Sequence, residues 1–384
     1  MYDVIVIGAG LSGLLAALTA RKNGFSTAVV ASGTGKLVQS TGLMDEIPIT
    51  TDASREEPSA AENTARIDVG QAVADFKKLV AGLGYPYRGE VGRPAAVVTG
   101  SGLLKTTALY PDTVAPVPEA GHALIVGFEE LADFQPAFVR ANLSRQRPKM
   151  RVDAIRIRLG CHSQRVMTQL DVAHLLDRKA IRETCVGRIR GQLQTKQIGA
   201  PDFCIFPAAL GWQHWREVTG SLSDELGATI TEAPGLPPNA TAIRLNDVLR
   251  EKAACCGVRF YENTAVSGGK IAGDRLQAIR IVTSARAEYL TGSQFILATG
   301  GILGGGLKMT DNGFAETALH LQATAAGTLA AVPKNVHAVG AMQRASSLTQ
   351  PVVGGVYTIW STLNALHQAL DALEKTDRGG IVNV

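Results

Sequence analysis

Apolar and polar residues at the start of the chain follow the order expected for a strand, a helix and a strand. Residues 2–7 form an apolar run typical of a buried strand, and residues 26–31 form a second one. Between them, residues 11–23 place apolar side chains at helical spacing, and the pattern stops at Gly24. These lengths predict a βαβ unit.

The middle of the chain, residues 61–233, alternates in the same way. Its pattern predicts strands and helices that pack as α/β layers of their own. The strands are predicted at 122–128, 152–159 and 202–210, and the helices at 133–143 and, as one long helix, at 171–193. The polar residues 50–63 before this region predict a loop.

A proline-rich connector at residues 234–238 ends the middle region. The pattern after it predicts a helix, a set of strands that ends in glycine turns, and a final long helix. The predicted elements are 246–257, 258–266, 276–284, 287–292, 294–299, 335–340 and 352–375.

Three glycines directly after the first predicted strand carry the strongest chemical signal. Gly8, Gly10 and Gly13 have the spacing G-x-G-x-x-G, with Ala9, Leu11 and Ser12 between them. The first glycine permits a tight turn, the second lets a pyrophosphate approach the backbone, and the third permits close helix–strand packing. Since the helix N-terminus also favours an anion, the turn predicts a dinucleotide site.

The fold class that follows is α/β, with a Rossmann-like FAD/NAD(P)-binding domain and an inserted second α/β domain. We expect residues 1–60 and 234–384 to form the first, discontinuous domain and residues 61–233 to form the second. The 41 glycines among 384 residues suit a fold with many tight strand-to-helix turns.

Composition adds expectations about compartment and membrane. The five cysteines include no C-x-x-C pair, so we expect buried free thiols in a reducing cytoplasm and no metal site. No basic leader precedes the N-terminal apolar run, which predicts a strand and not a signal peptide. No run reaches the roughly 20 apolar residues that cross a bilayer, so membrane contact requires a surface patch or a partner.

The net charge of +4 conceals a basic stretch. Residues 140–196 hold 14 Lys or Arg against 4 Asp or Glu. This stretch is either a solvated face or a surface for an anionic substrate, lipid or protein partner. Nucleic acid is not expected, because no binding motif accompanies the charge.

Two downstream segments resemble those of flavoproteins with two dinucleotide-binding domains. These are "ILATGG" and "NVHAVG", and "FYENTAV" resembles the strand that passes the adenine in such proteins. Flavoproteins of this class usually carry acids where this chain has Ala31 and Ala341. Each lost charged hydrogen bond removes roughly 1.5–3 kcal/mol, so we expect FAD held mainly through its pyrophosphate, with FMN as the alternative.

Nearly the whole chain resembles the B subunit of bacterial anaerobic glycerol-3-phosphate dehydrogenase. The matching segments are "VIVIGAGLSGLLAAL", "STGLMD", "GLLKTTAL", "VGFEELADFQPAFVRANL", "FPAALG", "PGLPPNATAIRL", "LATGGILGGGL", "NVHAVGAM" and "VVGGVY". The resemblance implies a flavin subunit that relays electrons from a catalytic flavoprotein subunit to an iron–sulfur subunit and quinone. It also implies a cytoplasmic location at the inner face of the cell membrane, reached only through partners.

Two alternatives remain at this stage. One is a free-standing flavin-dependent dehydrogenase of a small hydroxy or amino acid, and the other is a scaffold subunit that has lost its flavin. The segment between "GGGLKM" and "NVHAVG" is shorter than the resemblance implies, which argues against a closed substrate pocket. Intact Gly8, Gly10 and Gly13 argue against a lost flavin.

The resemblance places the remaining candidates around the cofactor. Lys105 is the catalytic candidate, since its charge could stabilise a reduced flavin anion. His162, His214 and His320 are weaker candidates for proton transfer, because histidine titrates near neutral pH. The further cofactor-binding candidates are Ser32, Ser40, Thr41, Gly42, Val266, Ala298, Thr299, Gly300, Gly340, Gly354 and Gly355.

Overall fold

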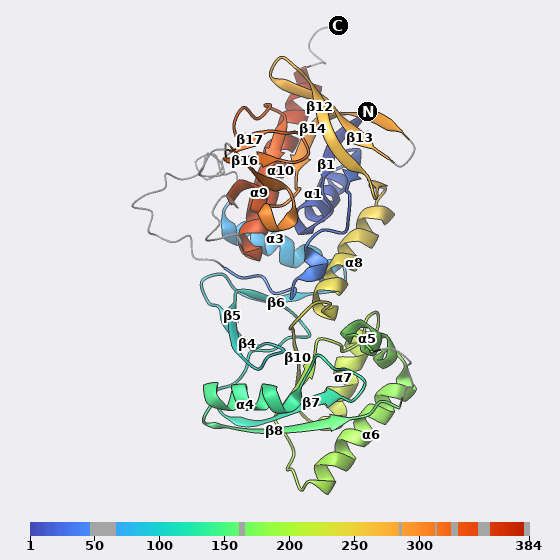
Figure 1. The fold of residues 1–384 in the computed structure, drawn as a ribbon, viewed down its shortest axis with the longest axis vertical. Helices are drawn as coiled ribbons and strands as arrows, with labels where there is room; N and C mark the ends of the chain where they lie inside the picture. The colour runs from blue at the N-terminus through green and yellow to red at the C-terminus, as the bar shows by residue number, and fades with distance from the viewer. Residues whose placement is uncertain are drawn as a thin grey trace, which may run out of the picture. The chain divides into compact units, whose positions relative to one another are not determined.

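The computed structural model describes residues 1–46, 67–160, 166–283, 286–311, 313–323, 329–344 and 354–379. The predicted loop at 50–63 and His162 lie outside these residues. The chain forms two compact units (Figure 1). The first unit contains Met1–Leu37, Glu46–Gly84 and Asn246–Val384, and the second contains Val38–Asp45 and Tyr85–Leu245.

A seven-stranded sheet forms the centre of the first unit, in the order β11-β2-β1-β14-β13-β12, with β18 beside β14. Strand β1 lies inside this sheet because its last four residues, Val4–Ile7, are apolar and buried. It pairs in parallel with both β2 and β14. The strands are β1 (Tyr2–Ile7), β2 (Thr27–Val30), β11 (Arg259–Tyr261), β12 (Ala265–Ala272), β13 (Arg275–Val282), β14 (Ala287–Leu297) and β18 (Val336–Ala338).

Strand β14 serves two kinds of pairing. Its first residues pair with β13 as an antiparallel ribbon, and its last residues pair in parallel with β1 and β18. The two separate strands predicted at 287–292 and 294–299 are therefore one strand, because Gly292 does not interrupt it. The helices that lie wholly in this unit are α1 (Leu11–Lys22), α3 (Val69–Gly82), α9 (Ala341–Arg344) and α10 (Gly355–Gly379). A small sheet of the same unit contains β15 (Leu307–Thr310), β16 (Gly313–Glu316) and β17 (Gln322–Ala323).

The second unit has its own parallel sheet, in the order β10-β9-β7-β8. This confirms the α/β alternation predicted for the middle of the chain. Its strands are β7 (Gly121–Phe128), β8 (Met150–Ile157), β9 (Phe203–Pro207) and β10 (Thr229–Ala233), and its helices are α4 (Pro136–Gln146), α5 (Gln169–Leu176), α6 (Lys179–Thr195) and α7 (Trp215–Leu226). Two short ribbons pair β3 (Tyr87–Gly89) with β6 (Leu109–Pro111) and β4 (Ala95–Val98) with β5 (Leu104–Thr107).

The prediction of one continuous helix at 171–193 is wrong, because this segment forms two helices, α5 and α6. Asp177 follows the last residue of α5, and its carboxylate accepts hydrogen bonds from the amides of Trp212, Gln213 and His214. A side chain held in this way fixes the chain at the break, although the apolar pattern continues past it.

The boundaries of the compact units lie elsewhere than the predicted positions 60/61 and 233/234. The chain passes between units after Leu37, Asp45, Gly84 and Leu245. Helix α3 belongs to the first unit, in which it packs against α10. Helix α8 (Ala240–Cys255) begins before the predicted residue 246, because Ala240, Ala242 and Leu245 are buried apolar residues that extend its pattern.

None of the helices in the described part of the chain combines the length and the apolar character needed to span a bilayer. Among the described cysteines, Cys185 and Cys204 are buried, and burial raises the pKa of each thiol to about 12. Cys255 is exposed, so the expectation of buried thiols is wrong at this position. It is the last residue of α8.

Candidate functional site

In the glycine turn after β1, close contacts within the protein explain why two of the three positions are glycine. Gly8 has φ +114°, and a Cβ there would lie 2.3 Å from the carbonyl oxygen of Ala298. A Cβ on Gly13 would lie 1.9 Å from the carbonyl oxygen of Gly8. These two positions require glycine for the fold itself.

Gly10 differs from both, because a Cβ there would meet no atom within 4 Å. Its backbone has φ −78° and ψ −170°, which any residue adopts. Neither packing nor backbone conformation therefore requires glycine at this position. The space beside Gly10 is where a bound group can approach the backbone.

Helix α1 begins directly at this open space. No side chain caps its N-terminus, and its first turn contains no acidic residue. The first amides of a helix have no partner within the helix, and the helix dipole adds partial positive charge there. The N-terminus of α1 and the free space at Gly10 together form a cradle suited to a phosphate or diphosphate.

The loop after β2 lies against the same turn. Gly35 has φ +75°, and a Cβ there would lie 2.6 Å from Cα of Gly10. Ala31, at the end of β2, has its backbone committed to the sheet edge: its amide donates to Tyr261 and its carbonyl accepts from Thr264, at 3.0 Å each. Where related flavoproteins usually carry an acid, the side chain of Ala31 is thus only a methyl group, which cannot accept a hydrogen bond. The neighbouring Ser32 is exposed.

A second glycine turn follows β14 and contacts the first. Thr299 follows Ala298, and its amide nitrogen lies 3.2 Å from the place of a Cβ on Gly8. The turn continues through Gly300, whose carbonyl oxygen would lie 1.9 Å from a Cβ on Gly306. The parallel pairing of β1 with β14 is what brings these two turns together.

A third glycine turn follows β18. Gly340 has φ +62°, a Cβ there would lie 2.5 Å from Oγ of Ser12, and its amide donates to Oγ of Ser361 at 2.9 Å. Ala341 starts the short helix α9, and Gly355 starts α10 after Gly354. The structure therefore brings the N-terminal turn together with Ala298–Gly300 and Gly340.

The other predicted site residues are placed differently. Val266 lies on β12 and pairs with Ile281 of β13. Residues 40–42 belong to the second unit, where the carbonyl of Gly42 accepts from the Tyr87 hydroxyl at 2.7 Å and the carbonyl of Thr41 accepts from Thr241. Lys105 also belongs to the second unit, and its ammonium lies 2.7 Å from the Asp45 carboxylate. Their roles toward a cofactor stay predictions.

Two of the candidate histidines, His214 and His320, lie on the surface. His214 is exposed and its Nδ1 lies 3.0 Å from Oε1 of Glu217, and His320 is exposed with φ +60°. Sequence reasoning did not single out His337 on β18, which is partly buried. Burial lowers its pKa to about 4, and its Nε2 lies 3.0 Å from Oε1 of Gln294.

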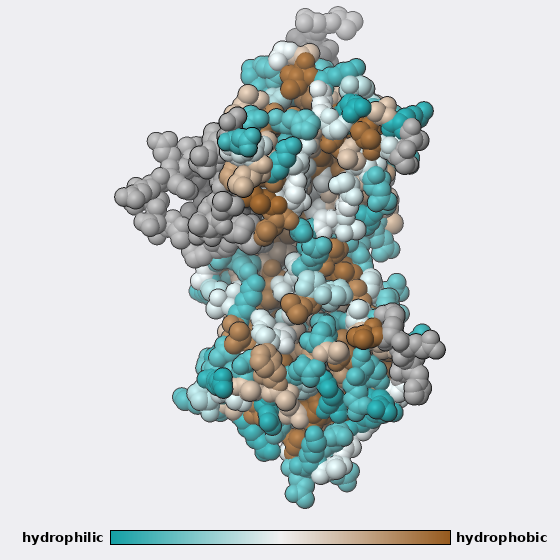
Figure 2. Space-filling view, viewed as in Figure 1, coloured by the Kyte–Doolittle hydropathy of each residue, from teal (hydrophilic) through white to brown (hydrophobic). Residues whose placement is uncertain are grey.

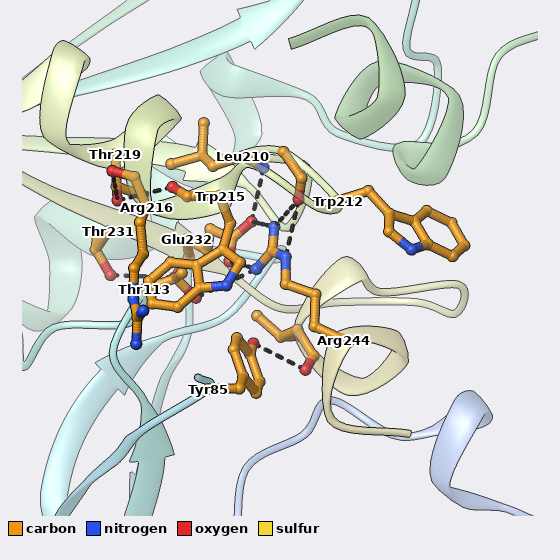
Figure 3. A network of polar contacts seen from close by, with 12 residues as sticks. Tyr85, Thr113, Leu210, Trp212, Trp215, Arg216, Thr219, Thr231, Glu232 and Arg244 are labelled. Atoms are coloured by element: carbon orange, nitrogen blue, oxygen red, sulfur yellow. Dashed lines mark hydrogen bonds and ion pairs between the residues drawn. The ribbon is translucent and has the colours of Figure 1, made fainter. Parts of the chain in front are cut away.

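A buried polar network in the second unit was also missed (Figure 3). Arg244 of α8 and Glu232 of β10 point toward one another, with side chains 2% and 0% exposed. The guanidinium donates to both carboxylate oxygens at 2.7 and 2.9 Å and to the carbonyl of Gly211. Burial alone would lower the pKa of Arg244, but the charge of Glu232 raises it, so the guanidinium stays charged.

Aromatic side chains surround this network. Burial raises the pKa of Tyr85 to about 12, and its hydroxyl donates to the carbonyl of Thr241 at 2.9 Å. Trp215 packs edge-on against Tyr85, and Trp212 stacks on His174 with centroids 4.3 Å apart. Both tryptophans thus pack against neighbouring rings. No local sequence signal could have found the network, because its members are far apart in the chain.

Comparison with known proteins places these features in a family. A family described as FAD binding domain matches residues 3–343. The chain is 27% identical over 325 residues to the probable B subunit of anaerobic glycerol-3-phosphate dehydrogenase of Halobacterium salinarum, covering 79% of this chain and 75% of that protein.

Bacterial relatives give the same result. The B subunit of anaerobic glycerol-3-phosphate dehydrogenase from Mannheimia succiniciproducens is 26% identical, with 80% of this chain and 75% of that protein covered. The corresponding protein from Vibrio cholerae is 26% identical, with 82% and 77% covered. The matched range of the FAD-binding family includes all three glycine turns, and the cradle at Gly10 fits the diphosphate of FAD.

Proposed function

Because the chain belongs to the family of FAD-binding domains, we propose that it is the FAD-carrying subunit of a respiratory dehydrogenase complex of the glycerol-3-phosphate dehydrogenase type. In this role it relays electrons from a catalytic flavoprotein subunit toward an iron–sulfur subunit and quinone. The observation that carries the proposal is the similarity, over about four fifths of the chain, to proteins named as the B subunit of that dehydrogenase.

The residues of the first unit supply the parts of such a site. The amides at the start of α1 and the space at Gly10 hold the diphosphate, and they do so without a charged side chain. The turn at Thr299 and the turn at Gly340 line the cofactor beyond the diphosphate, and the N-terminus of α10 adds partial positive charge. When bound, FAD supplies one- and two-electron redox chemistry.

We also propose that the charge of Lys105 stabilises a reduced flavin, although this lysine is paired with an acid. Its ammonium is paired with Asp45 at 2.7 Å, and both side chains are about one third exposed. Lys105 can act on a flavin only if it leaves this carboxylate or acts together with it. Asp45→Asn frees the lysine charge, so it should raise the flavin midpoint potential if Lys105 acts there, whereas Lys105→Met should lower it.

Ion pairs with nearby acids decide which part of the basic stretch 140–196 has unpaired charges that could bind a protein partner. Several of its side chains are neutralised by nearby acids, in the pairs Arg147–Glu119, Arg151–Asp153, Arg158–Glu129 and Arg190–Glu225. On the face in Figure 2 the surface around α6 is mostly hydrophilic, which suits a solvated role. Helix α4 is different: Arg140 and Arg145 are exposed and form no ion pair with the described residues, and Phe138 is 58% exposed.

We therefore assign partner docking to α4. Reversing both charges, as Arg140→Glu with Arg145→Glu, should weaken association with a partner subunit and reduce its salt dependence. Arg158→Glu with Arg190→Glu is the matched control, because it changes the net charge by the same amount at two arginines that are already paired, with Glu129 and Glu225, at 2.7 Å each. Equal effects of the two changes would show that only net charge matters.

Reconstitution tests the proposed function as a whole. The chain should be purified alone and together with its natural partners, and reduction of a dye by glycerol 3-phosphate should be measured for each. We expect turnover by the complex and none by the chain alone. Steady turnover by the isolated chain would instead identify a self-sufficient dehydrogenase, and a complex of full activity whose copy of this chain carries no flavin would identify a scaffold.

A further inference from the structure

Glu316, the last residue of β16, is a buried acid for which the proposed function gives no role. Glu316 is 0% exposed, and its carboxylate forms no ion pair within the described part of the chain. Hydrogen-bond donors occupy its two oxygens instead. The amide of Ala318 donates to Oε1 at 2.7 Å and the amide of Leu319 donates to Oε2 at 2.6 Å.

The third donor comes from the second glycine turn. The hydroxyl of Thr299 donates to Oε1 of Glu316 at 3.4 Å, across 17 positions of sequence. A buried carboxylate without a cation is costly, and burial raises the pKa of Glu316 while its three donors lower it. Glutamine could keep one oxygen for two of these donors, but its NH2 group would face the third, so the three contacts together require a carboxylate.

The next residue holds the other end of the same loop. The hydroxyl of Thr317 donates to the carbonyl of Gly305 at 2.9 Å, and its amide donates to the carbonyl of Gly306 at 3.0 Å. Residues 316 and 317 thus contact the loop 299–306 at its first residue and at its last two.

This loop needs external contacts because of its composition. Five of its eight residues are glycine, in the order T-G-G-I-L-G-G-G. Glycine loses more conformational freedom on ordering than any other residue, and it has no side chain with which to pack. The loop also lies against the N-terminal turn, because the amide nitrogen of Thr299 is 3.2 Å from the place of a Cβ on Gly8.

We infer that Glu316 is a positioning residue for FAD, and that its carboxylate orders the glycine-rich loop 299–306 through the hydroxyl of Thr299. Preorganisation of a binding loop removes part of the entropy that the ligand would otherwise have to overcome. The inference rests on FAD binding by this family and not on the proposed electron relay.

The test is a double-mutant cycle on apoprotein refilled with FAD. Thr299→Val removes the hydroxyl and keeps the shape, and it should weaken FAD binding about tenfold, whereas Thr299→Ser should stay within about threefold of the original chain. Glu316→Met removes the acceptor, whereas glutamine would keep a carbonyl oxygen for Thr299, and Glu316→Met should weaken binding at least as much as Thr299→Val. The double variant should bind no more weakly than Glu316→Met alone, because each single change already removes the contact between Thr299 and Glu316.

A matched control separates positioning from general loss of stability. Thr310→Val removes a hydroxyl that donates to the carbonyl of Gly313 at 3.2 Å, in the same β15–β16 hairpin but away from the loop. The dissociation constant should come from flavin fluorescence, and the visible spectrum of bound flavin is the second readout, since a loosened loop should blur its vibrational structure.

Two outcomes would overturn the inference. Additive effects of Thr299→Val and Glu316→Met would mean that Thr299 acts on FAD by itself. A loss of affinity in Thr310→Val as large as in Thr299→Val would mean that the hairpin matters only for stability. Failure of the original chain to bind FAD would refute the family-based premise, and failure of the electron relay would leave these measurements unchanged.

Discussion

Replacement of Gly10 by valine should remove FAD binding and leave the fold intact. A Cβ at this position meets no protein atom within 4 Å, and φ −78° suits a β-branched residue, so the protein itself has room for the side chain. Valine is a poorer N-cap residue than glycine, and the exchange costs on the order of 1 kcal/mol of stability, which the fold can tolerate. The new methyl groups occupy the space through which a diphosphate reaches the amides of α1.

The size of the effect follows from those amides. Loss of two charge-assisted hydrogen bonds, at roughly 1.5–3 kcal/mol each, weakens binding by about 3–6 kcal/mol, or on the order of 10²–10⁴-fold. Titration of apoprotein with FAD, followed by flavin fluorescence, measures this loss, and circular dichroism reports the fold.

The adjacent glycines provide the contrast. Gly13→Ala places a Cβ 1.9 Å from the carbonyl oxygen of Gly8, so this smaller change should destabilise the first unit itself. A Gly10→Val protein that binds FAD with unchanged affinity would refute the assignment of the cradle to the diphosphate. A Gly10→Val protein that fails to fold would refute the claim that the space is free.

Three further predictions concern single residues. Ala31→Glu should tighten FAD binding about tenfold by accepting from the adenosine ribose and leave FMN binding unchanged, as mass measurement of the released cofactor and titration with each flavin will show. Arg244→Met should destabilise the second unit by about 3–5 kcal/mol in urea unfolding, because Glu232 is left buried without its cation, and adding Glu232→Leu should recover much of this loss. The pKa of His337 is about 4 in the folded chain and 6.5 in the unfolded chain. Between these two pH values the unfolded state therefore binds more protons than the folded state. The free energy of unfolding should therefore fall by about 2–3 kcal/mol as pH falls from 7 to 4.5, and His337→Asn should lose this pH dependence in urea titrations at the two pH values.

Local pattern predicted the first βαβ unit closely. The predicted strand 2–7 is β1, and the predicted helix 11–23 and strand 26–31 correspond to Leu11–Lys22 and Thr27–Val30. These elements are buried runs with a uniform period, so sequence alone determines them. The short strands β3, β15 and β17 have two to four residues, which is too few to show any period.

Tertiary contacts decided what the pattern could not. The break between α5 and α6 depends on Asp177 meeting amides some 35 positions later in the chain. The early start of α8 depends on burial in the second unit, where Arg244 meets Glu232. An acid such as Glu316 at the end of a short strand suggests a solvent-facing position until its three donors are known.

The three glycine turns of the first unit share one principle of construction. Each lets a neighbouring group come close to the backbone by omitting a side chain, and each is then held by a group from another element. The carbonyl of Ala298 packs on Gly8, Glu316 holds Thr299, and Ser361 of α10 accepts the amide of Gly340. A site that exposes backbone to a ligand cannot stabilise itself with its own side chains. Its rigidity has to come from distant residues, and a family match that runs from residue 3 to residue 343 accords with a cofactor site distributed in this way along the chain.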